Sequence, residues 1–82
     1  MRLLKRIPHE RYLIELHQYN QKLILKISLD HYEQIFKIPQ TETSGPEDLE
    51  NLAHSEEFLG NCLKRFITMR EDLNASLNSE KK

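Results

Sequence analysis

The sequence predicts an α+β fold in which a three-stranded antiparallel meander has one face covered by a long C-terminal helix, with a short helix in the connection. Two patterns lead to this prediction. Between residues 9 and 38 apolar and polar residues alternate with the period of a β-strand. Between residues 56 and 78 apolar residues recur at helical spacing, and no proline interrupts them. A chain of 82 residues has room for one domain, which we expect to span residues 9–78.

The predicted hairpin turns determine which strand residues lie opposite each other. Asn20-Gln21 and Asp30-His31 are expected to be two-residue turns. They place Tyr12, Ile14 and Leu16 opposite Leu29, Ile27 and Leu25, and Leu29, Leu25 and Leu23 opposite Tyr32, Phe36 and Ile38. A slip of one residue would turn one of these apolar sets to solvent, so both turns predict the same register. The register also puts Glu15 beside Lys26 on the other face of the sheet.

The two ends of the chain have weaker patterns. Residues 1–8 are expected to form a tail or a short extra strand, and the tail is preferred because Pro8 interrupts the pattern. Residues 79–82 are expected to be disordered.

Two helix starts can be read between the meander and the C-terminus. Ser44 is an N-cap candidate, followed by Pro46 in the first turn, and Ser55 is a second N-cap candidate before two glutamates. The sequence leaves open whether the two helices are bent or continuous. Gly60 marks either a close approach of the helix backbone to the sheet or a tolerated loss of stability. Cys62 lies among apolar residues and is expected to be a buried, inert thiol.

The long helix is predicted to be longer than the sheet that it covers. A helix of this length extends for roughly 34 Å, whereas a seven-residue strand extends for about 23 Å. Its C-terminal turns should therefore overhang, and its apolar arc is wide enough for a second contact. We expect this interface to contain Met69, Arg70, Leu73 and Leu77. Arg70 interrupts the arc; it is either solvated or paired with Glu71 or Asp72 of a second chain.

A second candidate interface lies on the outer face of the sheet. Leu13, Ile24 and Ile35 point away from the predicted core, among charged and polar neighbours. Scattered exposed aliphatic residues are common on monomers, so these three residues are either ordinary surface or a packing surface for another protein or subunit.

Residues with catalytic or metal-binding chemistry are few. Glu50, His54 and Glu57 are spaced by four and then three residues, which on one continuous helix would place them on a common face. They are weak metal-binding candidates, because a solvated helix junction has the same pattern. No nucleophile motif or phosphate-binding loop is present in the sequence. We therefore expect no metal, no cofactor and no enzymatic activity.

Composition restricts the classes of partner. The formal net charge of −1 supplies no positive field for nucleic acid or for an anionic membrane. No segment is long and apolar enough to span a bilayer. The single cysteine permits no intrachain disulfide, which favours a reducing compartment and a cytoplasmic location.

Three segments carry a resemblance to other proteins: Glu33-Gln34-Ile35-Phe36-Lys37, Gly45-Pro46-Glu47-Asp48-Leu49, and a helix with Phe58, Phe66 and Met69. Over residues 10–77 the chain resembles short uncharacterised proteins of Bacteroidetes-type bacteria. The resemblance implies a soluble bacterial protein and no particular activity.

Two functions are expected from these observations. The first is a small non-enzymatic protein that acts in protein–protein interaction or homodimerisation through the helix overhang. The alternative is a small-ligand or metal-binding protein that uses Glu50, His54 and Glu57.

Overall fold

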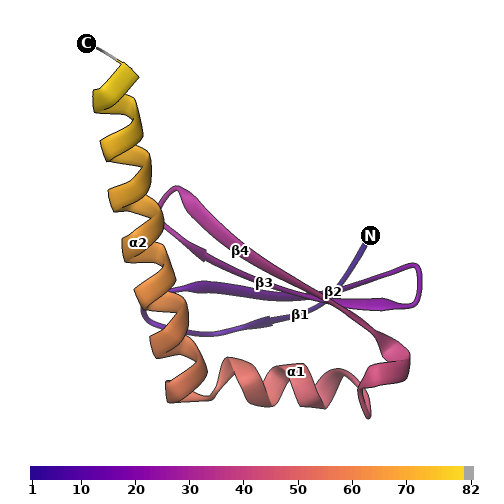
Figure 1. The fold of residues 1–82 in the computed structure, drawn as a ribbon. Helices are drawn as coiled ribbons and strands as arrows, with labels where there is room; N and C mark the ends of the chain where they lie inside the picture. Colours follow the sequence, from indigo (N-terminus) through magenta and orange to yellow (C-terminus); the bar gives the residue numbers. More distant parts are fainter. Residues whose placement is uncertain (81–82) are drawn as a thin grey trace.

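The computed structural model describes residues 1–80, with side chains through residue 79. Four antiparallel strands form one sheet in the order β1-β2-β3-β4, and two helices follow them (Figure 1). The elements are β1 (Arg2–Ile7), β2 (Leu13–Tyr19), β3 (Lys22–Leu29), β4 (Tyr32–Pro39), a short 3₁₀ helix (Gln40–Glu42), α1 (Pro46–Ala53) and α2 (Glu56–Glu80). The α+β class is confirmed, but the sheet has four strands where the sequence predicted three.

The fourth strand is the N-terminal segment, which forms β1 and is not a tail. It pairs with β2 from Arg2 opposite Gln18 to Ile7 opposite Ile14, and its register shifts at a bulge after Leu3. Ile7 is buried and extends the apolar row of the core. Pro8 comes directly after the strand, where it removes no hydrogen bond from the ladder.

The other end of the chain also differs from expectation. α2 continues through Glu80, so residues 79 and 80 are helical and not disordered. The expectation for residues 81–82 lies outside the described residues.

The predicted register of the meander is confirmed. Ile14 and Leu16 lie opposite Ile27 and Leu25. Leu23, Leu25 and Leu29 lie opposite Ile38, Phe36 and Tyr32. Both residues of the first turn have left-handed backbones, with φ of 48° at Asn20 and 61° at Gln21, as a type I′ hairpin turn requires.

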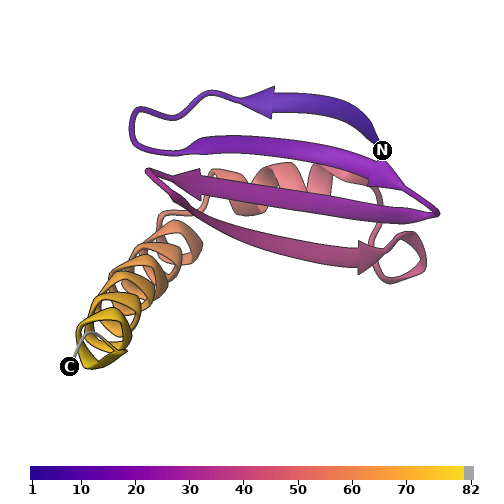
Figure 2. The ribbon, with the colours of Figure 1, turned by 90° about the horizontal axis from the view of Figure 1, so that it is seen from above.

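Both helices pack on the same face of the sheet. α1 runs beneath the strands, and α2 stands steeply at the end of the sheet that carries the β3–β4 turn (Figures 1 and 2). The buried core combines strand residues with Leu49 and Ala53 of α1 and with Leu59, Cys62 and Phe66 of α2. The face expected to lie under the long helix alone is therefore covered by α1 together with the N-terminal half of α2.

The helix starts agree only in part with the predicted caps. Ser55 caps α2, because its Oγ accepts a hydrogen bond from the Phe58 backbone N–H at 3.2 Å. The N-cap of α1 is Gly45 with φ of 142°, not Ser44, whose backbone N–H instead donates to Asp48 Oδ2 at 2.7 Å. α1 ends at His54, so the two helices are separate.

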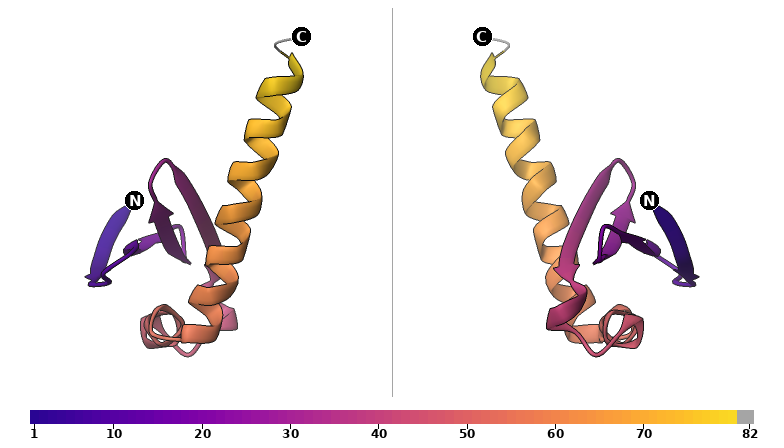
Figure 3. Two further views of the ribbon diagram at one scale, coloured as in Figure 1. Left: turned by 90° about the vertical axis from the view of Figure 1, so that its left-hand side faces the viewer. Right: turned by 90° about the vertical axis from the view of Figure 1, so that its right-hand side faces the viewer.

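Tyr12, which precedes β2, and Gln34 of β4 form hydrogen bonds with the N-terminal half of α2. The Tyr12 hydroxyl donates to the Leu59 carbonyl at 3.3 Å. Gln34 Nε2 donates to the Cys62 carbonyl at 2.8 Å, and Gln34 Oε1 accepts from Arg65 Nε at 2.9 Å. These three bonds fall between Leu59 and Arg65 in the N-terminal half of α2, and the rest of the helix extends away from the sheet (Figure 3).

Candidate functional site

The C-terminal part of α2, residues 70–80, projects beyond the sheet, and we call it the overhang (Figure 3). Leu73 and Leu77 are 45% and 46% exposed, and Ile67, just before the overhang, is 40% exposed. The predicted overhang is thus confirmed. These half-exposed aliphatic side chains make the projecting part of α2 a candidate interaction surface.

The exposed leucines continue the stripe of α2 that packs on the sheet. The residues of this stripe are spaced alternately by four and three positions, like the a and d positions of a heptad repeat. They are Leu59, Leu63, Phe66, Arg70, Leu73 and Leu77. The first three face the core, and the last three lie beyond it. This side of α2 therefore packs on the core through Phe66, whereas Leu73 and Leu77 at its far end are half exposed.

A groove lies where the overhang leaves the sheet, and we call it the turn groove. It has a volume of about 240 Å³ between the β3–β4 turn and α2. Its walls are Leu29, Asp30 and Tyr32 on one side and Phe66, Ile67 and Arg70 on the other. The walls are mainly apolar, with Asp30 and Arg70 as the two charged residues, so the groove suits a single aliphatic side chain.

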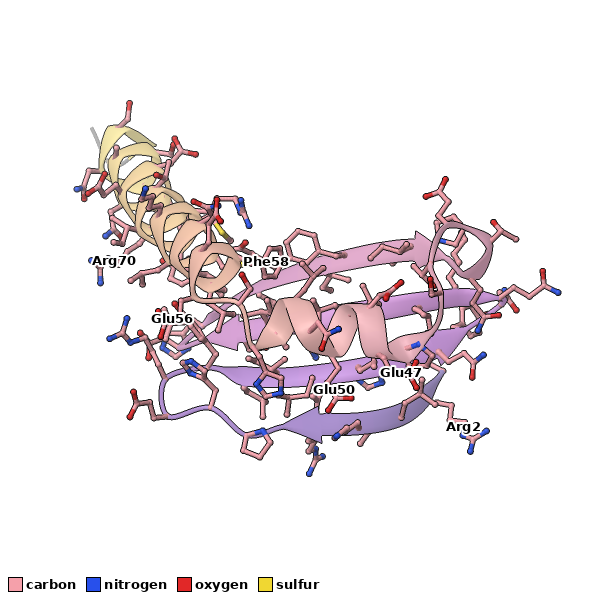
Figure 4. All side chains as sticks on the ribbon, turned by 90° about the horizontal axis from the view of Figure 1, so that it is seen from below. Arg2, Glu47, Glu50, Glu56, Phe58 and Arg70 are labelled. Carbon is pink, nitrogen blue, oxygen red and sulfur yellow. The ribbon has the colours of Figure 1, made fainter. Side chains whose placement is uncertain are left out.

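The interface residues expected on the helix differ in exposure. Met69 is partly buried and packs against the core, so it belongs to the intramolecular contact. Arg70 is exposed (Figure 4), and it makes no ion pair with any residue that the structure describes. It interrupts the apolar stripe as predicted.

The outer face of the sheet, opposite α1, contains the second candidate interface. Leu13 and Ile35 are half exposed, whereas Ile24 is only 6% exposed, so the expectation that all three form a surface is wrong for Ile24. His17 and Lys37 are its cross-strand neighbours on this face. A hollow of about 490 Å³, the outer-face hollow, lies over Ile24 and Ile35.

A charged cluster lies next to this hollow. Glu15 accepts a hydrogen bond from His17 Nε2 at 3.1 Å and one from Arg6 Nε at 3.1 Å. The bond from His17, and then that from Arg6, lower the pKa of Glu15, although burial acts in the opposite direction. Glu15 and Lys26 are cross-strand neighbours as predicted, but Lys26 pairs with Glu33 at 3.5 Å. The bond to Arg6 was not predicted, because residues 1–8 carry no clear strand pattern.

The metal-binding candidates are not brought together. Glu50 on α1 forms an ion pair with Lys5 of β1, and Figure 4 shows its side chain on the β1 side of α1. His54 ends α1, and Glu57 belongs to the first turn of α2. The break between the helices removes the common face that the spacing requires. Within residues 1–80 no group of three or more His, Cys, Asp or Glu side chains is arranged to hold a metal ion.

Two further expectations about α2 are decided by packing. Cys62 is fully buried, and burial raises the pKa of its thiol despite the nearby Arg65 guanidinium, which acts in the opposite direction. A raised pKa disfavours the nucleophilic thiolate. A Cβ atom on Gly60 would meet nothing within 4 Å, so the glycine does not mark a close backbone approach.

None of the described helices is long and apolar enough to cross a membrane. Comparison with known protein families, with curated proteins and with solved structures gave no match. The resemblance to short Bacteroidetes-type proteins therefore stays a prediction, and the function is argued from the residues alone.

Proposed function

We propose that this protein is a non-enzymatic homodimeric interaction module in which two copies pair through their overhangs. The observation that supports this proposal is the heptad stripe, which packs on the sheet through Phe66 and then continues past the sheet with half-exposed Leu73 and Leu77. Covering those leucines removes apolar area from water, which favours association by about 25 cal/mol per Å².

An antiparallel pair of helices fits the stripe better than a parallel pair. In a parallel pair each stripe position faces itself, which would place the Arg70 guanidinium of one copy against that of the other. In an antiparallel pair centred between Glu71 and Asp72, Arg70 faces Leu73 of the second copy. Asp72 of the second copy then lies one residue away and supplies an opposite charge. Such a pair has the self-complementary contacts of a twofold dimer.

The same register gives the turn groove an occupant. Residue 66 of one copy lies opposite residue 77 of the other, so Leu77 enters the groove that Phe66 and Ile67 line. Each copy contributes one leucine and one groove. The half-exposed leucines of the overhang, Leu73 and Leu77, are then covered in both copies of the dimer.

Mass in solution tests the dimer. We expect sedimentation equilibrium at high micromolar concentration to give twice the chain mass of 9.8 kDa. The variant Leu73→Lys/Leu77→Lys should give the monomer mass at the same concentration. The matched control Ala75→Lys/Ser79→Lys, with the same charges on the opposite side of the helix, should remain dimeric. A protein that is monomeric at high micromolar concentration would refute the proposal.

Cysteine cross-linking tests the orientation. An antiparallel pair brings position 70 of one copy to position 73 of the other, so a mixture of Arg70→Cys and Leu73→Cys chains should form a heterodimeric disulfide. A parallel pair would instead cross-link Arg70→Cys chains with one another. The native Cys62 should not interfere, because it is fully buried.

Absence of enzymatic activity, a cytoplasmic location and a protein partner are parts of the same proposal. The raised pKa of Cys62 makes it a poor nucleophile, and its free thiol suits a reducing compartment. The net charge of −1 favours a protein partner over nucleic acid. Fractionation of the source cells tests the location.

A further inference from the structure

We propose that the outer-face hollow binds a small amphipathic carboxylate, that is, an anion attached to an apolar body. The hollow lies on the face turned to the viewer in Figure 2, opposite α1 and away from the overhang. Its volume of about 490 Å³ falls within the range of about 300–1,000 Å³ that is usual for small-molecule sites. The inference is independent of the dimer proposed above.

The floor of the hollow is apolar. Ile24 and Ile35 come from neighbouring strands, and the Tyr19 ring lines the hollow near the β2–β3 turn. Ile24 is buried without a ligand, with only 6% of its surface exposed, whereas Ile35 and Tyr19 are 50% and 52% exposed. A ligand with an aliphatic body would therefore cover mainly Ile35 and Tyr19.

The charged groups around the hollow favour an anion. Lys26 and Lys37 line it together with His17, and none of the lining residues within residues 1–80 is acidic. The two acidic residues nearby are already paired: Glu15 with Arg6 and His17, and Glu33 with Lys26 at 3.5 Å. Lys37 forms no ion pair with a residue in the described part of the chain. An incoming carboxylate would meet Lys37 without displacing an existing pair.

His17 adds an unpaired polar atom to this surface. Its Nε2 donates to Glu15, while its Nδ1 is buried without a hydrogen-bond partner among the described residues. A buried polar atom without a partner is costly, by about 1–3 kcal/mol. Because Nε2 donates to Glu15, Nδ1 of a neutral ring is an acceptor, which a carboxylate oxygen cannot satisfy; a water molecule that enters with the ligand can donate to it.

Larger occupants fit the hollow less well. A second copy docked face to face would bring the Lys26 and Lys37 side chains of both chains together, where like charges repel. Single-stranded nucleic acid needs several exposed aromatic rings for stacking. Among the described residues that line the hollow, Tyr19 carries the one well-exposed aromatic ring. A small amphipathic anion would place its carboxylate near the lysines and its apolar body on the isoleucines of the floor.

A titration with sodium octanoate, followed by amide NMR shifts, tests the inference. We expect saturable shifts at Tyr19, Ile24, Ile35 and Lys37. Acetate carries the charge without the apolar body, and octan-1-ol carries the body without the charge, so each should bind at least tenfold more weakly than octanoate. The variant Lys26→Gln/Lys37→Gln should lose at least tenfold in octanoate affinity. The matched control Arg11→Gln/Lys64→Gln removes the same charge elsewhere and should bind octanoate as the unmodified protein does.

Four results would overturn the inference. These are shifts that do not saturate, equal binding of octanoate and octan-1-ol, equal affinity in the two double variants, and shifts centred on Ile67 and Arg70 at the turn groove. Sedimentation at saturating octanoate should leave the mass unchanged. A mass change with shifts on the outer face would instead indicate that a second copy covers it.

Discussion

Replacing Gln34 by methionine should destabilise the protein by about 2 kcal/mol, because Gln34 joins β4 to α2 by two hydrogen bonds. Its amide donates to the Cys62 carbonyl at 2.8 Å and accepts from Arg65 Nε at 2.9 Å. Gln34 is 9% exposed. Methionine has a similar length and stays apolar, so the variant removes the two bonds while largely keeping the packing.

The magnitude follows from what each partner does after the substitution. The Cys62 carbonyl keeps its hydrogen bond within the helix, so losing the additional bond from Gln34 costs about 1 kcal/mol, the typical net value. The Arg65 side chain reaches solvent and is rehydrated, so its bond is also assigned about 1 kcal/mol, below the usual value for a charged donor. A change of about 2 kcal/mol lowers the Tm of a domain of this size by roughly 8–16 °C.

Urea unfolding followed by far-UV circular dichroism measures the change, at two protein concentrations so that any dimer contribution is separated. The control is Glu33→Met, the same replacement at the neighbouring, exposed position of β4. It removes one surface ion pair with Lys26 and should cost less than about 0.5 kcal/mol. Equal stability of Gln34→Met and Glu33→Met would refute the conclusion that Gln34 holds α2 against the sheet.

Three further substitutions have expected outcomes. Gly60→Ala should stabilise the protein by about 0.5–1 kcal/mol in urea unfolding, because a Cβ there meets nothing within 4 Å and alanine favours the helix; a lower urea midpoint would contradict this. Gln21→Gly should raise the urea midpoint by the equivalent of up to about 1 kcal/mol, because φ at Gln21 is 61° and glycine adopts that backbone without strain; an unchanged midpoint would count against the type I′ turn. The pKa of Glu15 is lower in the folded than in the unfolded protein, so its stabilisation is complete above its ordinary value of 4.5 and is lost as the pH falls through the lowered value. The Tm difference between the protein and Glu15→Gln should therefore shrink on acidification below 4.5, and a difference independent of pH would exclude this role of Glu15.

The parts of the fold that were predicted correctly depend on neighbours in sequence. The register around the Asn20-Gln21 turn follows from a two-residue loop and a period of two, both visible in the chain. The start of α2 follows from Ser55, whose side chain caps the helix by accepting a hydrogen bond from the backbone N–H of Phe58, three residues later. For residues 1–8 the sequence left open a tail or a short extra strand. Strand β1 has no such local signal, because three of its exposed positions, Arg2, Lys5 and Arg6, are charged and its pairing needs β2.

The candidate site was predicted in its position but not in its shape. The heptad spacing from Leu59 to Leu77 is present in the sequence and would have shown that one stripe serves both the core and the overhang. The turn groove could not be anticipated, because its walls come from the β3–β4 turn and from α2, more than thirty residues apart. The burial of Ile24 was missed for the same reason, since it depends on side chains from neighbouring strands.

The sequence by itself determined the meander register, the helix starts and the presence of an overhang, because hydrophobic period, turn chemistry and helix length are local properties of the chain. Only the tertiary structure decided the direction in which α2 projects and therefore which surface the overhang forms with the sheet. That direction depends on the bonds from Tyr12 and Gln34 to carbonyls of α2, formed between residues 47 and 28 positions apart. Such contacts exist only after the chain has folded, so no pattern within a single segment indicates them.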